Sequence, residues 1–578
     1  MVEYLSEVGF RFAIYEQTEA PGPTPWIRDN PLKPHPASQE TQDKVHAWLQ
    51  NCKNEHPGCG KFAAPGFLPT RLIDVGGLPE FQDPVLVATQ KFNSSTAISY
   101  ATLSHCWGST VHLKTTSATL DEHERSIPFS TLNRTFRDAI EVTRSLGLQY
   151  LWIDSLCIIQ DSEDDWAKEA SQMAAIYKNG FVCIAACSAC DGDQGFLNVR
   201  SLPCEVTSGT NPARAFWMRL PAIRPATERF SHLADRAWCF QEEILAPRTL
   251  YYSKDQVCFK CHSCSYQSEE DELDMKATFS ENYTSTSPHL FLPKIQKGFV
   301  APHYTSALSQ ATKVWHDLVE EYSTLKLTYS TDKLPAIAGL AAEFGKARGA
   351  DYLAGLWKHD IPQGLCWQLG GNERRPTRAS DGFMAPSWSW ASQASSITYC
   401  TSSWRQTIWD AKLLESRINH IGGPYGKVTG GYLKMNGRLL SISLEFSGAM
   451  ALARAVLENE SSSDIGHFPL DDSELDRRGK FWAFLLGTEA RTTNTCVLFL
   501  VEVVNKSNTY KRIGYKTIDP KNLEVKEEDM GEASSEKGTV YIAERNRHEG
   551  SSDEGENSDI SNDIWKDLNV QHRDIILL

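Results

Sequence analysis

Polar and aromatic side chains follow a short apolar segment, and their types suit the binding of a nucleotide. The stretch Ser-His-Cys-Trp-Gly ends the apolar run that begins at Tyr100, and it contributes Ser104, Trp107 and Gly108. It can present a hydroxyl, an aromatic face and a bare backbone to a ligand. A structural alternative stays open, in which Trp107 closes the core and Gly108 makes the turn. All three are candidate substrate-binding residues.

A carboxylate ends a second apolar segment, Gln-Tyr-Leu-Trp-Ile-Asp, at Asp154. A charge in such surroundings must be hydrogen-bonded or must face a site. Asp154 is therefore a candidate for binding a ribose. Capping of the following loop through backbone N–H groups is the alternative, and the sequence does not decide between the two.

The same stretches also contain the residue types of a Cys-His-Asp hydrolase, namely His105, Cys106 and Asp154. In that chemistry the histidine must reach the cysteine to activate it. Neighbouring residues on a strand point to opposite faces, so His105 is poorly placed to do so. The sequence disfavours this hydrolase.

Two cysteine groups have spacings close to those of zinc sites. They are Cys52-x3-His56-x2-Cys59 and Cys258-x2-Cys261-x2-Cys264, the second with His262 inside it. A structural zinc site takes four ligands, usually in recognisable pairs. Neither group has that pattern, although the two could meet in space. Reduced, buried thiols are the favoured interpretation, and no metal ligand is assigned.

The elements that must position these residues alternate between strand and helix signals over 92–265. Strands are expected at 100–104, 149–154, 181–186, 248–252 and 256–260, and helices at 131–146, from 162 onward and at 238–245. Apolar strands separated by helices predict a doubly wound parallel sheet. Ligands bind beyond the carboxyl ends of such strands, where Ser104, Asp154 and Ser188 are expected.

The remainder of the chain divides by composition. We expect an N-terminal arm with a small Cys/His-containing segment over 1–91, followed by the dense domain at 92–265. An acidic linker is expected at 266–300, and an accessory α/β region rich in aromatic residues at 301–523. Residues 524–578 form an acidic tail that is predicted to be largely disordered.

The overall composition limits the function classes. The chain has 578 residues and a net charge of −15, which disfavours nucleic acid as a partner. The N-terminus does not resemble a signal peptide, and no apolar run approaches the roughly 18 residues that a membrane helix needs. The 15 cysteines then fit reduced thiols and a cytoplasmic location.

Three blocks of sequence carry a family resemblance. They are YATLSHCWG at 100–108, LWIDSLCIIQDSEDDWAKEASQMAAIYKNG at 151–180 and RAWCFQEEILAPRTL at 236–250. In this order they resemble the HET (heterokaryon incompatibility) domain of filamentous fungi. The resemblance implies a role in non-self recognition that triggers cell death, an incompatibility partner protein of unknown identity, and self-association through the domain.

The HET domain is in turn similar to TIR domains, which have a flavodoxin-like parallel sheet. In TIR enzymes that consume NAD, the glutamate of a WCxxE helix is catalytic. The matching residues here run from Trp238 to Glu242. The resemblance thus implies that Glu242 is catalytic, that Trp238 binds substrate, and that NAD is a substrate rather than a cofactor. The chain departs from the family at Ile159, Glu243 and Phe259-Lys260-Cys261.

Two interpretations of Glu242 remain open. A carboxylate beside the ribose suits cleavage of the nicotinamide N-glycosidic bond, whose transition state resembles an oxocarbenium ion. Alternatively Glu242 forms a structural ion pair with Arg236 or Arg248. The protein would then be a non-catalytic signalling adaptor that acts through homotypic association, because one fold can serve both roles.

Overall fold

A computed structural model describes most of the chain. The described residues are 13–16, 27–28, 32–56, 58–59, 66–77, 82–92, 98–108, 113–200, 204–208, 211–219, 231–263, 266–269, 307–349, 351–370, 382–399, 407–447, 450–456, 462–471, 475, 477–489, 494–518, 523–524, 543–544 and 570–578. The chain forms two compact units, Met1–Lys294 and Ile295–Leu578. Each unit is described by itself.

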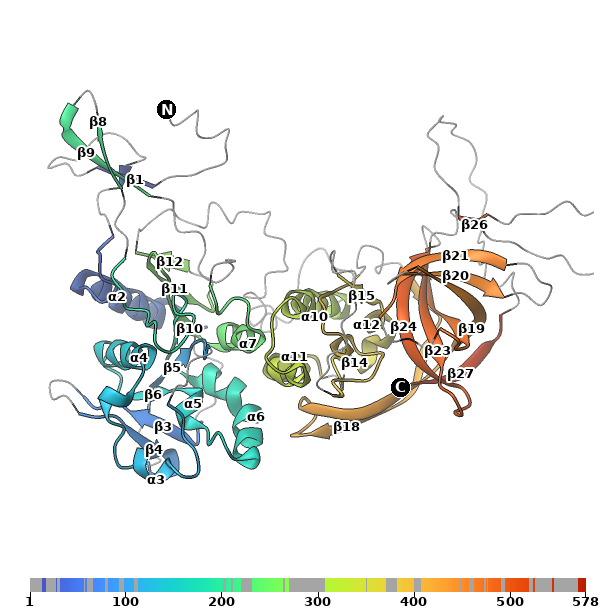
Figure 1. Cartoon of the computed structure of the whole chain (residues 1–578), viewed down its shortest axis with the longest axis horizontal. Helices are drawn as coiled ribbons and strands as arrows, with labels where there is room; N and C mark the ends of the chain where they lie inside the picture. The colour runs from blue at the N-terminus through green and yellow to red at the C-terminus, as the bar shows by residue number, and fades with distance from the viewer. Residues whose placement is uncertain are drawn as a thin grey trace, which may run out of the picture. The chain divides into compact units, whose positions relative to one another are not determined.

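The first unit is built on an eight-stranded sheet (Figure 1). In spatial order its strands are β12 (Tyr266–Ser268), β11 (Val257–Cys261), β10 (Arg248–Tyr252), β7 (Val182–Ala185), β5 (Tyr100–Ser104), β6 (Tyr150–Trp152), β3 (Arg71–Asp74) and β4 (Val85–Ala88). The four central strands, β10, β7, β5 and β6, are parallel. The outer strands pair antiparallel to their neighbours.

The central strands confirm the predicted α/β fold with parallel strands, and the antiparallel edges add to it. In chain order their arrangement is 2-1-3-4, which is that of a doubly wound sheet. The direction of winding reverses after β6, so right-handed connections place the first connecting helix on one face and the later ones on the other. Figure 1 shows α4 on one side of the sheet and α6 with α7 on the other.

The helices begin and end where local signals place them. They are α2 (Gln39–Glu55), α3 (Leu120–His123), α4 (Arg134–Ser145), α5 (Asp154–Cys157), α6 (Glu163–Asn179) and α7 (Ala237–Leu245). Asn133 and Ser162 accept backbone N–H groups as N-caps of α4 and α6. Gly147 follows α4 at φ +70°, and Leu148 N–H donates to the Thr143 carbonyl, which closes the helix as a glycine C-cap.

Two features of the first unit were not expected from the sequence. A small sheet orders β2 (Ile27–Arg28), β1 (Ala13–Glu16), β9 (Asn211–Arg219) and β8 (Cys204–Ser208). Residues 266–269, assigned to the acidic linker, instead form the edge strand β12 and a buried Glu269. Glu269 is held inside because Arg200 pairs with it at 2.9 Å and Thr41 donates to it at 2.6 Å. The remainder of the predicted linker lies outside the described residues.

The second unit packs an aromatic core beside a large sheet. Its helices are α10 (Ala307–Ser323), α11 (Ala338–Arg348) and α12 (Ile361–Gly364), and short strands are β13 (Tyr352–Leu353), β14 (Leu356–Trp357), β15 (Trp367–Leu369), β16 (Ile397–Tyr399), β25 (Leu523–Glu524) and β26 (Ala543–Glu544). The largest fully buried side chains include five tryptophans, at positions 315, 357, 367, 388 and 390. Their burial places these aromatic residues in the core of the second unit.

The large sheet of the second unit has nine strands. They are β17 (Thr407–Trp409), β18 (Lys412–Ile421), β19 (Lys427–Ser447), β20 (Met450–Val456), β21 (Ser462–Pro469), β22 (Phe481–Glu489), β23 (Thr495–Glu502), β24 (Thr509–Ile518) and β27 (His572–Leu577). Because β19 pairs with both β27 and β22, the run from β22 through β23, β24 and β27 closes on itself. Strand β27 belongs to the predicted acidic tail, and most of that tail lies outside the described residues.

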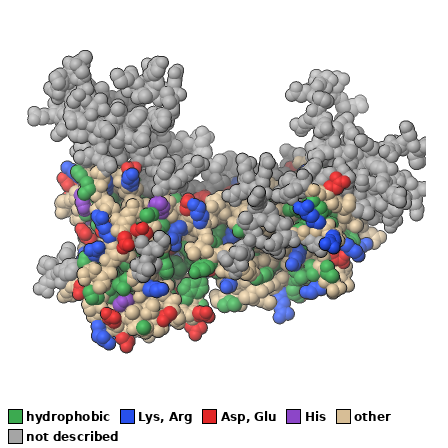
Figure 2. All heavy atoms as spheres, viewed as in Figure 1, with side chains coloured by type: hydrophobic (Ala, Val, Ile, Leu, Met, Phe, Trp, Pro, Cys, Tyr) green, Lys and Arg blue, Asp and Glu red, His purple; other side chains and the backbone are tan. Residues whose placement is uncertain are grey.

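The described surface offers no single dominant charge on the face seen in Figure 2, where acidic and basic side chains are interspersed. Among the described residues, none of the helices combines the length and apolar character that crossing a bilayer requires.

Candidate active site

The carboxyl ends of β5 and β6 bring three of the predicted residues to one edge of the sheet. Ser104 is the last residue of β5, and Asp154 begins α5 directly after β6. The indole N–H of Trp107 donates to Asp154 Oδ2 at 2.8 Å. Asp154 Oδ1 accepts the backbone N–H of Ser155 at 2.7 Å. Asp154 therefore caps its loop and also holds Trp107 at the edge.

Glu242 reaches the same edge from α7. Its side chain is only 6% exposed, and its neighbours include Ser104, Asp154 and the hydroxyl of Tyr177. Burial raises the pKa of the Glu242 carboxyl to about 7, and the charge of Asp154 adds to this rise. A hydrogen bond from Ser104, the charge of Arg236 and the nearby Tyr177 hydroxyl oppose this rise in the pKa.

One oxygen of this buried carboxylate is unsatisfied. Glu242 Oε2 has no hydrogen-bond partner among the described residues. A buried polar atom without a partner costs free energy, so such atoms in a native fold call for an explanation. A ligand that donates a hydrogen bond at this edge would provide one.

The structural ion-pair interpretation of Glu242 is not supported by the geometry. Within the described part of the chain no ion pair joins it to Arg236 or Arg248. Arg236 lies close enough to influence the carboxylate, and its side chain hydrogen-bonds Cys106. Arg248 is the first residue of β10, and its Nε donates at 3.2 Å to the Sγ of Cys52 in the last turn of α2.

Trp238 and Gly108 are the remaining residues of the predicted substrate-binding set, and the structure gives them different roles. Trp238 precedes Glu242 by four residues on α7, so the two share a helix face, and Trp238 is half-buried. Gly108 has φ +67°, and a Cβ there would lie 2.3 Å from Asp191 Cβ. Glycine is therefore required at this turn by conformation and by close packing. This supports the turn interpretation of Gly108.

The cysteine and histidine beside Ser104 do not form a nucleophilic pair. His105 lies edge-on against Phe136 of α4, and its Nε2 is 3.9 Å from Asp154 Oδ1. Cys106 instead belongs to a cluster that includes Cys187 and Cys239. The two side chains have separate environments, as the alternation along a strand predicts.

Sequence reasoning missed Tyr177 as a neighbour of the site. The helical pattern placed it on the packed face of α6, and it is buried there. Its hydroxyl donates to the Leu103 carbonyl at 3.0 Å, directly before Ser104, and lies close enough to Glu242 to lower the pKa of that carboxyl. A tyrosine on a buried helix face needs a partner for its hydroxyl, and this need was the available signal.

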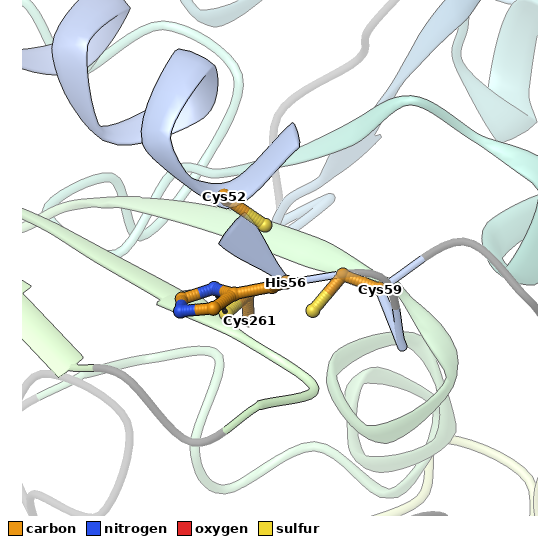
Figure 3. A group of neighbouring side chains, drawn as sticks. All are labelled: Cys52, His56, Cys59 and Cys261. Atoms are coloured by element: carbon orange, nitrogen blue, oxygen red, sulfur yellow. Dashed lines mark hydrogen bonds between the residues drawn. The ribbon is translucent and has the colours of Figure 1, made fainter. Parts of the chain in front are cut away.

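A second cluster of reactive side chains lies elsewhere in the first unit. Cys52, His56, Cys59 and Cys261 come together, with their ligand atoms all within 4.8 Å of one another (Figure 3). The sequence placed these residues in two separate groups and assigned no metal ligand. Cys258 is buried elsewhere, in the cluster with Cys106, and Cys264 lies outside the described residues.

Comparisons with known proteins identify the domain that carries the candidate active site. Neither the curated proteins nor the solved structures gave a match. Residues 100–242 match a family model described as heterokaryon incompatibility protein (HET). The match runs from the first residue of β5 to Glu242 on α7. The first unit of this chain therefore contains a region similar to the HET family, which supports a function of the heterokaryon incompatibility type in general.

Proposed function

We propose that this protein acts in fungal non-self recognition by triggering cell death, and that its HET domain does so by hydrolysing NAD at Glu242. The observation that carries the proposal is the buried Glu242 carboxylate, with one unsatisfied oxygen, beside Ser104 at the carboxyl edge of the parallel sheet. The Trp238-to-Glu242 spacing that resembles NAD-consuming TIR domains supports the choice of substrate.

The reaction breaks the bond between C1′ of the ribose and the nicotinamide nitrogen. The electron pair leaves with nicotinamide, which neutralises its pyridinium charge, so no strong acid is needed. Positive charge then develops on the ribose ring, and the ionised Glu242 carboxylate stabilises it. Water adds to C1′ and loses a proton, which yields ADP-ribose, nicotinamide and one proton.

The surrounding side chains have supporting roles in this proposal. Ser104 donates to Glu242, and the nearby Tyr177 hydroxyl also lowers the pKa of this carboxyl, so both favour its ionised form. Each oxygen of Asp154 has one protein donor, so lone pairs remain for a ribose hydroxyl. The half-buried indoles of Trp107 and Trp238 offer aromatic surface to the nucleotide.

A second candidate function rests on the low solvent exposure of the residues at this edge of the sheet. Ser104 and Glu242 are 5% and 6% exposed, so a substrate would need a local opening to reach them. In a non-catalytic adaptor the same groups would remain closed, and the domain would act through homotypic association. In an enzyme, self-association would supply the opening. The two functions therefore differ in whether Glu242 is needed for chemistry.

NAD loss over time tests the proposal with full-length protein at high concentration. Wild type should consume NAD, and Glu242→Gln should lower the rate by about 100-fold or more, as expected when a charge-stabilising group is removed. Glu243→Gln is the matched control, because Glu243 accepts from Tyr251 and Lys260 at 2.9 and 3.4 Å, away from the site. It should retain the wild-type rate.

Two results would move the conclusion to the adaptor. One is the absence of NAD loss from folded, concentrated wild type. The other is equal loss from wild type and Glu242→Gln. A Glu242→Ala variant that still pulls down the same partners and still kills cells would then support homotypic association as the mechanism.

A further inference from the structure

We infer that Cys52, His56, Cys59 and Cys261 form a structural zinc site that joins the N-terminal helix α2 to the sheet. Three sulfurs and one imidazole nitrogen are a ligand set that zinc takes in structural sites. The protein would supply all four ligands of a tetrahedral zinc ion, so no coordination position is left for a catalytic water. The proposal is independent of the chemistry at Glu242.

The end of α2 brings three of the ligands together. Cys52 lies in the last turn of the helix and His56 is its C-cap, four residues later, so both project from the same side. The backbone N–H of Cys59 donates to the His56 carbonyl at 2.9 Å, which turns the chain back on itself. This turn returns Cys59 to the helix end.

The sheet supplies the fourth ligand. Cys261 is the last residue of β11, about two hundred positions along the chain, and its sulfur lies 3.3 Å from His56 Nδ1. Tetrahedral bonds of about 2.3 Å to sulfur and 2.0 Å to nitrogen would separate the ligand atoms by about 3.5–3.8 Å. The observed group, within 4.8 Å throughout, needs only small side-chain adjustments to reach this geometry. Figure 3 shows the four side chains gathered between α2 and β11.

The charge next to the cluster supports a metal rather than neutral thiols. Arg248 pairs directly with Cys261 across β10 and β11, and it is 7% exposed. Its guanidinium donates to Cys52 Sγ at 3.2 Å and to the carbonyls of Cys59 and Phe181 at 3.3 and 3.2 Å. Within the described residues no carboxylate forms an ion pair with it.

A buried guanidinium without a carboxylate needs another negative partner. Three thiolates alone would carry too much charge for one arginine. Three thiolates with one Zn²⁺ carry a single net negative charge, which Arg248 balances. Ser263, whose hydroxyl lies 3.3 Å from Cys59 Sγ, adds a further contact of the kind that orients metal ligands.

The zinc content of full-length protein tests this site directly. Wild type purified from zinc-supplied cells should carry one zinc per chain by mass spectrometry of the metal. Cys52→Ser and Cys261→Ser should lose most of it. Cys190→Ser changes an exposed thiol outside the cluster and should retain the metal. His56→Cys should also retain it, because four thiolates bind zinc equally well.

Cobalt provides a readout on the wild type that does not depend on a variant folding. Co²⁺ exchanged into the protein should give the intense sulfur-to-metal absorption and visible bands of a tetrahedral thiolate site. Arg248→Met should lower the zinc affinity by about 10–100-fold, as expected for a residue that supports the ligands. An unchanged affinity would contradict the charge argument.

Three results would overturn the site. These are wild-type protein without zinc and without cobalt absorption, undiminished zinc in Cys261→Ser, and a disulfide between two of the three cysteines in protein purified without reductant. The last result would identify the cluster as a redox pair with a histidine neighbour.

Discussion

Because Glu242 is buried, its ionised form lowers the free energy of unfolding of the protein. Burial raises its pKa to about 7 from an ordinary value of 4.5, so the folded protein binds this proton more tightly than the unfolded chain. The resulting penalty is absent below pH 4.5, grows as the pH rises to 7, and is complete above it. A shift of this size corresponds to about 3 kcal/mol.

Glu242→Gln should therefore stabilise the first unit at alkaline pH. In urea unfolding at about pH 8 the variant should exceed wild type by up to about 3 kcal/mol, and the difference should vanish near about pH 4. Such a gain in stability with loss of activity is typical of functional carboxylates. If the variant is instead less stable than wild type at alkaline pH, Glu242 has a structural role.

Gly108 allows a sharp test of turn packing at the same edge. Gly108→Ala meets both a positive φ and a Cβ contact of 2.3 Å, so it should destabilise the unit by about 3 kcal/mol or more. Gly147→Ala is the matched control, since it has φ +70° with no atom within 4 Å of the new Cβ. It should cost only about 1 kcal/mol by thermal unfolding. Equal costs would show that the Asp191 loop yields easily.

At the scale of elements, the edge strand β12 depends on one buried ion pair. Glu269 and Arg200 are each 4% exposed at the side chain, and Glu269 also accepts from Thr41 of α2. The pair therefore joins three segments that are distant in sequence. Removing one partner of such a pair leaves the other charge buried and uncompensated.

Glu269→Ala should lower the free energy of unfolding of the first unit by about 3–5 kcal/mol. Glu124→Ala breaks a more exposed pair with Lys91 and should cost less than about 1 kcal/mol. Chemical denaturation of the full chain, followed through the first transition, measures both variants. A small effect of Glu269→Ala would mean that water reaches Arg200 when its partner is removed.

The tryptophans of the second unit show where an element-scale pattern misleads. Trp388 and Trp390 alternate as in a half-buried strand, yet both are fully buried in a turn that leads into a short 3-10 helix, Trp390–Ser392. Ser389 donates to the Ala354 carbonyl, and Trp390 Nε1 donates to the Gly355 carbonyl at 2.9 Å. The side chains of this segment therefore hydrogen-bond to a distant loop rather than packing as part of a sheet.

At the scale of the molecule, the last residues of the chain complete the second unit. Strand β27 pairs antiparallel with β19 and parallel with β24, and it buries Ile575 and Leu577. The backbone N–H of Ser387 also donates to the Leu578 carbonyl at 3.1 Å. This short strand is what closes the sheet between β24 and β19.

Deletion of residues 570–578 should therefore open the sheet and expose the edges of two strands. Exposed edges pair with other chains, so the truncated protein should aggregate and lose the unfolding transition of the second unit. The first unit should unfold at its original midpoint by differential scanning calorimetry. A matched deletion within 551–559, which leaves β27 in place, is the control and should leave both transitions unchanged.

Much of the first unit follows from local sequence alone. The strands at 100–104 and 248–252 and the helix that ends before Gly147 were predictable, and the strand expected at 256–260 lies one residue later, at 257–261. Apolar periodicity, N-caps and a C-terminal glycine act between near neighbours. The doubly wound order brought Ser104 and Asp154 to one edge, since parallel strands end on the same side.

Other features were decided only by the tertiary structure. The joining of Cys52, His56 and Cys59 to Cys261, the burial of Glu269, and the pairing of β27 connect segments far apart in the chain. The spacing of residues within one segment cannot predict such contacts, because they form only when separate elements pack. The raised pKa of Glu242 has the same origin, since burial in the folded unit causes it and the charge of Asp154, from a separate segment, adds to it.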